Sequence, residues 1–348
     1  MYKYKHYKEE LIMAKENAYD RLKVLTRTLY DYQAIRISLY NRIVSKEYLA
    51  EVKKELEKNS GKKAKKTKDE KAEEAKLRKM MIDKMIQWYM DHHTIIDLHP
   101  RLSSQMKALE EETARTNGPI TDFAKYNLIK DYILMADRED DIKKIQAYEL
   151  KNIPIYNEFL ANVPGCGPMM SSIIISTIDI HKTVHVSSIW RYAGIDVWTN
   201  PDTGEQVARN NHSEQLIDRE YISKDGKVET KKSTTYNPAF RTKMLGVLGD
   251  SFVKHKGKYR DIYDQGRVKY SMREGWKPAR IHRAAIRYTI KEFLRDLWNK
   301  WRELEGYPPE LDWYETQRQR AHGVSAEPIN SVRTTANGDI IPDDITLF

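Results

Sequence analysis

The sequence predicts a mostly α-helical protein in two parts, with a small β-hairpin insertion in the second part. Three observations lead to this fold class. Apolar residues recur every three or four positions through most of the first hundred residues and again over 278–305, which is the spacing of one helix face. Glycine and proline gather at a few points, chiefly 163–168. Short strand-like runs separated by turn sequences occur within 196–236.

The composition favours a nucleic-acid partner. The 348 residues contain 60 Lys and Arg against 51 Asp and Glu, a formal net charge of +9, together with 22 Tyr and 7 Trp. Lys and Arg neutralise phosphates, and aromatic rings stack on bases. DNA is therefore the expected partner, with RNA as the alternative.

The same composition argues against secretion and membrane insertion. Cys166 is the single cysteine, which excludes an intramolecular disulfide and suits a reducing compartment. The chain has no apolar run of about 18 residues, and its N-terminus lacks the apolar segment of a signal peptide. We expect a cytoplasmic protein without a membrane partner.

The first part, residues 1–117, is expected to be an antiparallel helical hairpin, that is, a coiled coil. Apolar residues keep helical spacing from about residue 8 to 56, and the spacing resumes over 77–96. Between them, 58–76 contain many lysines and no large apolar side chain, so we expect a solvated, partly disordered tip. Apolar seams of this length usually pair, which predicts a homodimer through the coiled coil.

Two segments of the first part invite a functional interpretation. The tip carries the basic residues Lys62, Lys63, Lys65 and Lys66, which either contact nucleic acid or are simply solvated. Near the end of the second helix, His92, His93 and His99 accompany Asp91 and Asp97. No second ligand group follows them at a characteristic spacing, so we assign no metal site.

The second part, residues 118–310, is organised around the sequence VPGCGP at 163–168. Gly165 and Gly167 allow positive φ and close backbone approach, and Pro168 suits the first position of a helix. The free backbone N–H groups of such a turn bind anions, and in a helix-hairpin-helix the anion is a nucleic-acid phosphate. A plain corner between two packed helices is the alternative.

Periodicity and turn sequences define the other elements of the second part. Helices are expected near 121–135, 138–150, 187–194, 238–252 and 278–305. Residues 196–236 predict either two small hairpins or a flexible basic insertion. In the last helix we expect the basic residues to point largely outward: Arg280, Arg283, Arg287, Lys291 and Arg295. Residues 321–348 lack periodicity and are expected to be disordered.

The landmarks of the second part occur in an order that resembles a known family. VPGCGP at 163–168 is followed by IDI at 178–180, YAGI at 192–195, NPAFR at 237–241 and a long closing helix. This order resembles the C-terminal transposase domain of the DEDD-type insertion-sequence transposases, a family that includes the Piv-like DNA invertases and the bridge-RNA-guided recombinases. The resemblance covers about 155–305.

The chain matches the chemistry that this resemblance implies only in part. Family members carry a RuvC-like N-terminal domain whose carboxylates hold divalent metal, and their C-terminal domain supplies a serine nucleophile. Residues 1–58 contain no strand with an Asp, so no cofactor is identified and a divalent metal is expected only if a RuvC-like partner exists. The serine position matches Thr203 best, in PDTG at 201–204, and Ser213 is a further hydroxyl. For both residues a solvated loop hydroxyl is the alternative.

The function that we predict is DNA binding by a mobile-element or phage protein in recombination or transposition, as a degenerate transposase. The predicted DNA contacts are Gly165, Cys166, Gly167, Met169, Lys182, Arg191, Arg209, Arg241, Lys243 and Arg283. Two other functions remain open. An active recombinase would use a Ser or Thr nucleophile with its metal-bearing half missing or supplied in trans, and a coiled-coil scaffold would bind RNA.

Overall fold

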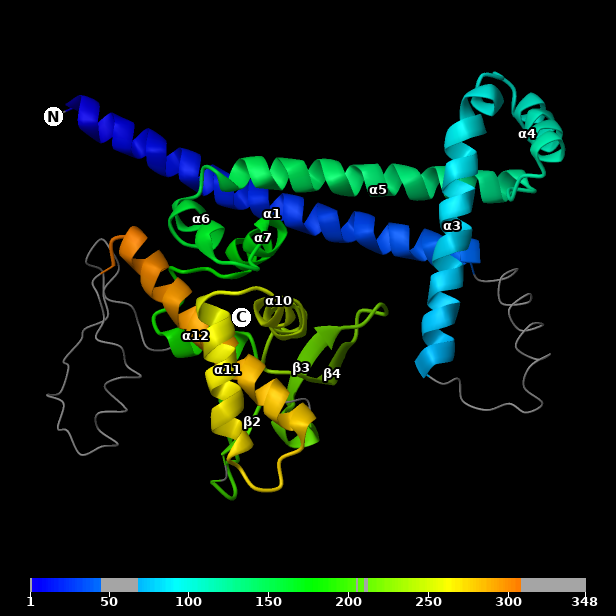
Figure 1. Cartoon of the computed structure of the whole chain (residues 1–348). Helices are drawn as coiled ribbons and strands as arrows, with labels where there is room; N and C mark the ends of the chain where they lie inside the picture. The colour runs from blue at the N-terminus through cyan, green and yellow to red at the C-terminus, as the bar shows by residue number, and fades with distance from the viewer. Residues whose placement is uncertain (1, 45–67, 205, 210–211, 308–348) are drawn as a thin grey trace, which may run out of the picture. The chain divides into compact units, whose positions relative to one another are not determined.

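The computed structural model describes residues 2–44, 68–204, 206–209 and 212–307, and these are mostly helical, as predicted (Figure 1). Contacts divide the chain into unit 1, Met1–Lys23 with Gln146–Phe348, and unit 2, Val24–Ile145. The contact-based boundary therefore lies at 145/146 instead of 117/118, and the first residues belong with the C-terminal unit. The predicted tip lysines 62, 63, 65 and 66 and the tail 321–348 lie outside the described residues.

The described residues of unit 2 form four helices. These are the second half of α1 (Tyr2–Val44), α3 (Lys68–Asp97), α4 (Leu102–Thr116) and most of α5 (Phe123–Leu150). Residues 68–76, predicted to belong to the solvated tip, form the start of α3. The two segments expected at 121–135 and 138–150 are one helix, α5, because nothing between them breaks helical structure.

The helix that runs alongside α1 is α5, so the helical hairpin predicted within residues 1–117 has the wrong pairing. The Arg36 guanidinium of α1 forms an ion pair with the buried Glu139 carboxylate of α5, and the rings of Tyr40 and Tyr132 lie 6.4 Å apart. Figure 1 shows α3 crossing α1 and α5 near one end of the pair. The physical reason is that α5 offers Arg36 both the Tyr132 ring and the Glu139 carboxylate.

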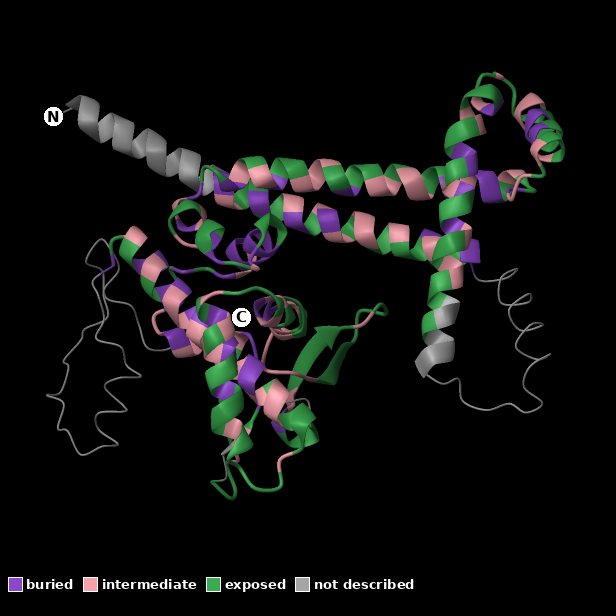
Figure 2. Cartoon of the chain, in the orientation of Figure 1, coloured by how far each residue is buried: buried purple, intermediate pink, exposed green. Residues whose placement is uncertain are grey.

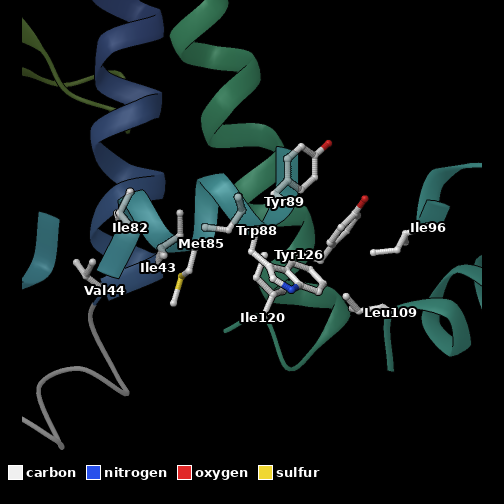
Figure 3. Close-up of a cluster of buried hydrophobic side chains, with 11 residues drawn as sticks. Ile43, Val44, Ile82, Met85, Trp88, Tyr89, Ile96, Leu109, Ile120 and Tyr126 are labelled. Carbon is white, nitrogen blue, oxygen red and sulfur yellow. The ribbon is translucent and has the colours of Figure 1, made fainter. Parts of the chain in front are cut away.

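The core of unit 2 lies where α1, α3 and α5 meet. Figure 3 shows Ile43 and Val44 at the end of α1 beside Met85 and Trp88 of α3. The Trp88 indole donates a hydrogen bond of 2.8 Å to Thr116 Oγ1 at the end of α4. Gly118 follows, and a Cβ there would lie 2.4 Å from Trp88 Nε1, so only glycine fits under this ring. Burial of these side chains stabilises the crossing.

The first half of unit 1 contains short elements and two small sheets. The helical pieces are α6 (Pro154–Glu158), the 3₁₀ turn η1 (Leu160–Asn162), α7 (Pro168–Thr177), α8 (Val186–Tyr192) and the 3₁₀ turn η2 (Ser213–Gln215). Strands β1 (Val197–Thr199) and β2 (Gln206–Ala208) pair antiparallel, with Val197 opposite Ala208. Strands β3 (Ile217–Ile222) and β4 (Val228–Ser233) pair likewise and are largely exposed (Figure 2). Of the two predictions for 196–236, the structure therefore has the two hairpins.

The second half of unit 1 packs around the last helix. A helical segment runs through α9 (Pro238–Thr242), the π-helix η3 (Lys243–Leu248) and α10 (Gly249–Lys254), and α11 (Lys258–Ser271) follows. The closing helix α12 (Pro278–Leu304) begins with Pro278 at its first turn, as predicted. Its Trp298 indole donates a 2.9 Å hydrogen bond to the carbonyl of Thr183, which fixes α12 against the segment before α8.

Glycine at position 249 sets how closely α10 approaches α12. A Cβ on Gly249 would lie 2.5 Å from Ile286 Cγ2 of α12. We expect Gly249→Ala to lower the free energy of unfolding by about 1–3 kcal/mol through overpacking. The matched control is Gly246→Ala in the preceding π-helix, where nothing lies within 4 Å of the new Cβ. Urea denaturation should show the control neutral or up to about 1 kcal/mol more stable, and equal losses in both variants would contradict the close approach.

Candidate nucleic-acid interface

Residues 163–168 form a tight turn that ends at an exposed helix start. Gly165 has φ of +88°, a left-handed conformation that favours glycine. Gly167 is the residue before α7, with no side-chain cap, and is exposed with Pro168 and Met169. The Met169 and Met170 amides belong to the first turn of α7, where a helix leaves its N–H groups without intrahelical acceptors. These amides can bind an anion.

Contacts with the end of α10 hold the turn in place. Ser251 Oγ donates a 2.8 Å hydrogen bond to the Gly165 carbonyl. A Cβ on Gly165 would lie 2.8 Å from that hydroxyl oxygen, so the turn and α10 are in close contact. On the other side, Gly257, with φ of +142°, lies against Pro164. The turn therefore has a fixed position relative to residues 251–257.

The Cys166 side chain is part of the buried core beneath the turn. The Cys166 amide donates to the Val163 carbonyl at 3.0 Å, so this N–H group is not free for an anion. Burial raises the pKa of the Cys166 thiol to about 11, with the Ser171 hydroxyl 3.6 Å from the sulfur. The predicted contact at Cys166 is therefore not a side-chain contact, in contrast to the exposed Met169.

The structure places a basic loop beside the turn that sequence reasoning missed. The loop has the sequence KHKGK at 254–258, and we name it the basic loop. Lys254 and Lys256 are exposed, whereas Lys258 forms an ion pair of 2.7 Å with Asp296. The run of basic residues was visible in the sequence. Its place at the turn was not, because the two segments lie some ninety residues apart and meet only through Ser251 and Gly257.

The other predicted DNA contacts differ in their exposure. Arg191 and Arg283 are exposed. Lys182 is exposed with an Asp179 carboxylate 3.5 Å away, and both residues line a pocket of about 140 Å³ with Ser188. Lys243 is half-buried in the π-helix.

Arg209 is buried in an ion pair, which corrects its prediction as a DNA contact. Its guanidinium makes two hydrogen bonds with the Asp196 carboxylate, of 2.6 and 2.8 Å, and one of 2.7 Å with Thr235 Oγ1. Its side chain is only 8% exposed. The pair closes the base of the β1–β2 hairpin, since Asp196 precedes β1 and Arg209 follows β2.

Arg241 lies where two of the sequence landmarks pack together. The Asn237 side chain donates a 2.8 Å hydrogen bond to the Tyr192 hydroxyl, joining 237–241 to 192–195. The Arg241 guanidinium lies 4.8 Å from the centre of the Tyr236 ring and donates to the Arg209 carbonyl at 3.1 Å. Its Nη1 is buried and has no hydrogen-bond partner in the described part of the chain.

Three basic residues of α12 that were predicted to point outward are half-buried: Arg287, Lys291 and Arg295. Burial lowers the pKa of the Arg287 guanidinium, and the positive charge of Arg241 is the second cause. Burial likewise lowers the pKa of Lys291, with Arg287 as the second cause. Lys291 Nζ also lies 5.0 Å from the Trp190 ring centre. The Arg287 and Lys291 side chains are half-buried because elements before and after the β hairpins cover this face of α12.

The candidate nucleophiles lie in exposed turns. The Thr203 amide is 3.3 Å from the Asn200 side-chain oxygen, which accepts its hydrogen bond in the turn between β1 and β2. Ser213 is exposed in η2. Within the described ranges, no three His, Cys, Asp or Glu residues are arranged to hold a metal ion.

Comparison of the chain with protein-family models, with curated proteins and with solved structures gives no match. None of the helices described is both long and apolar enough to cross a membrane.

Proposed function

We propose that unit 1 binds DNA through its phosphate backbone, as a helix-hairpin-helix protein of recombination or transposition. The observation that carries the proposal is the exposed first turn of α7 beside the exposed Lys254 and Lys256. Backbone amides at a helix start and nearby lysines attract the same ligand, a phosphate. The landmarks that resemble a transposase domain support the same assignment, because members of that family act on DNA.

Removing the two exposed lysines of the basic loop is the direct test. We expect the full chain with Lys254→Gln and Lys256→Gln to bind a labelled DNA duplex about tenfold more weakly at moderate salt. The slope of log Kd against log salt should fall by about 0.9 for each phosphate that the variant no longer neutralises. Fluorescence anisotropy over a salt series measures both quantities.

The matched control is the double variant Lys107→Gln with Lys144→Gln. These two residues are exposed in unit 2 and form surface ion pairs with Glu111 and Asp141. The control removes the same total charge, so it separates a local contact from the effect of net charge. Equal losses in the two double variants would refute the interface, and the absence of wild-type binding to any duplex would refute the function.

A further inference from the structure

Within its described residues, unit 1 contains a group of cations that form no ion pair with a carboxylate. Arg241 on α9 and Arg287 and Lys291 on α12 form this group, which we name the cationic cluster. Each guanidinium has a buried Nη1 without a hydrogen-bond partner among the residues described. The positive charge of Arg241 contributes to lowering the pKa of Arg287, and Arg287 and Lys291 are four residues apart on one face of α12. Three positive charges therefore approach one another in a partly desolvated place.

The carboxylates near the cluster already form ion pairs with other arginines. The negative charge of Asp196 raises the pKa of both Arg287 and Lys291, but its two carboxylate oxygens already accept hydrogen bonds from Arg209. Glu292 acts on Lys291 and forms a 2.6 Å ion pair with Arg295. Arg209, Arg287 and Lys291 therefore share the single carboxylate of Asp196. Buried like charges destabilise a fold unless an anion joins them.

We propose that the cationic cluster binds a phosphate group. Two guanidinium groups and an ammonium match the charge and the several acceptor oxygens of a phosphate, and guanidinium groups bind phosphate oxygens in pairs. Arg287 and Lys291 are half-buried, so part of each side chain reaches the surface. The site is distinct in its residues from the turn at 163–168, and its role with DNA rests on the proposed function.

The cluster borders a surface that is itself basic and aromatic. Tyr270 of α11 lies within electrostatic range of Arg287 and stacks with Trp276, the ring centres 5.8 Å apart. The Arg273 and Arg280 guanidinium groups lie 4.9 and 4.2 Å from the centre of the Trp276 ring. Both arginines are exposed. A phosphate that reaches the cluster would therefore approach over a positively charged surface.

Thermal unfolding with inorganic phosphate tests the cluster without assuming DNA. We expect the melting temperature of the full chain to rise by about 3–5 °C when phosphate replaces chloride at equal ionic strength and exceeds its Kd about tenfold. Arg287→Gln and Lys291→Gln should each reduce this rise to less than about 1 °C. In chloride alone, both variants should melt at or above the wild-type temperature, because each removes a poorly neutralised charge. A merely structural role predicts lower melting temperatures instead.

The matched control is Lys300→Gln, about two and a half turns beyond Lys291 along α12 and on the opposite face of the helix. Among the described residues, Lys300 forms an ion pair only with Glu303 in the next turn of the helix. The control should keep the full phosphate response. A wild-type chain that does not respond to phosphate, or a response that survives in both cluster variants, would overturn the proposal.

A second arm replaces phosphate by a DNA duplex. Arg287→Gln and Lys291→Gln should each weaken DNA binding about tenfold relative to Lys300→Gln. If wild type binds DNA and the variants bind equally well, the cluster is not a DNA contact although the proposed function stands. If phosphate stabilises wild type through the cluster and no duplex binds, the proposed function fails and the cluster takes a smaller phosphate compound.

Discussion

Asp196→Asn is expected to lower the free energy of unfolding by about 3–5 kcal/mol. The substitution keeps the shape of the side chain but removes the charge that pairs with the buried Arg209 guanidinium. It also removes the carboxylate that offsets the positive charges of Arg287 and Lys291. A buried cation without its partner is far more unfavourable than an exposed one, which explains the size of the effect.

Urea denaturation of matched variants measures this loss. Asp218→Asn makes the same chemical change in an exposed ion pair, that of Asp218 with Lys232 at 2.8 Å, and should cost less than about 1 kcal/mol. Replacing the whole buried pair, with Asp196→Leu and Arg209→Met, should restore part of the stability that Asp196→Asn removes. Similar losses for Asp196→Asn and Asp218→Asn would contradict the burial of the pair.

Phe293→Ala is expected to cost about 3–5 kcal/mol as well, through loss of the central ring of unit 1. Phe293 is fully buried at 0% exposure. Its ring centre lies 5.3 Å from those of Phe252 and Tyr259 and 6.1 Å from that of Phe159. These three rings come from three other segments of unit 1, so one cavity would weaken the contacts of α12 with all of them.

Two further substitutions in α12 calibrate this result. Phe293→Leu keeps most of the apolar volume and should cost clearly less than Phe293→Ala. Asn299→Ala changes an exposed residue of the same helix and should alter the free energy of unfolding by no more than about 0.5 kcal/mol. A Phe293→Ala chain as stable as Asn299→Ala would show that the ring cluster does not hold unit 1 together.

Substitutions along α12 should thus change the free energy of unfolding in opposite directions. Loss of Phe293 removes apolar contacts and destabilises, whereas loss of the charge at Arg287 or Lys291 is expected to be neutral or stabilising in the absence of phosphate. Ligand sites commonly retain groups that the fold alone disfavours. This opposition is the property that separates the cationic cluster from the rest of the helix.

Much of the local structure was predictable from short stretches of sequence. The start of α12 at Pro278, the end of α8 before Gly194 with its positive φ of +64°, and the two hairpins of 196–236 all follow from periodicity, proline and turn residues. The turn at 163–168 has the expected positive φ at Gly165, whereas Gly167 has φ of −69°. The basic tip and the tail lie outside the described residues, and the homodimer, the RNA partner and recombinase activity stay predictions.

The sequence by itself determined the mostly helical class and the limits of the main turns, because these depend on residues that are neighbours along the chain. Only the tertiary structure decided that α1 packs along α5, that the basic loop borders the turn at 163–168, that Arg209 is buried, and that Arg241, Arg287 and Lys291 are half-buried. The burial of a charged side chain depends on which distant segments cover it, and helical spacing alone places an arginine on a face without indicating what packs against that face.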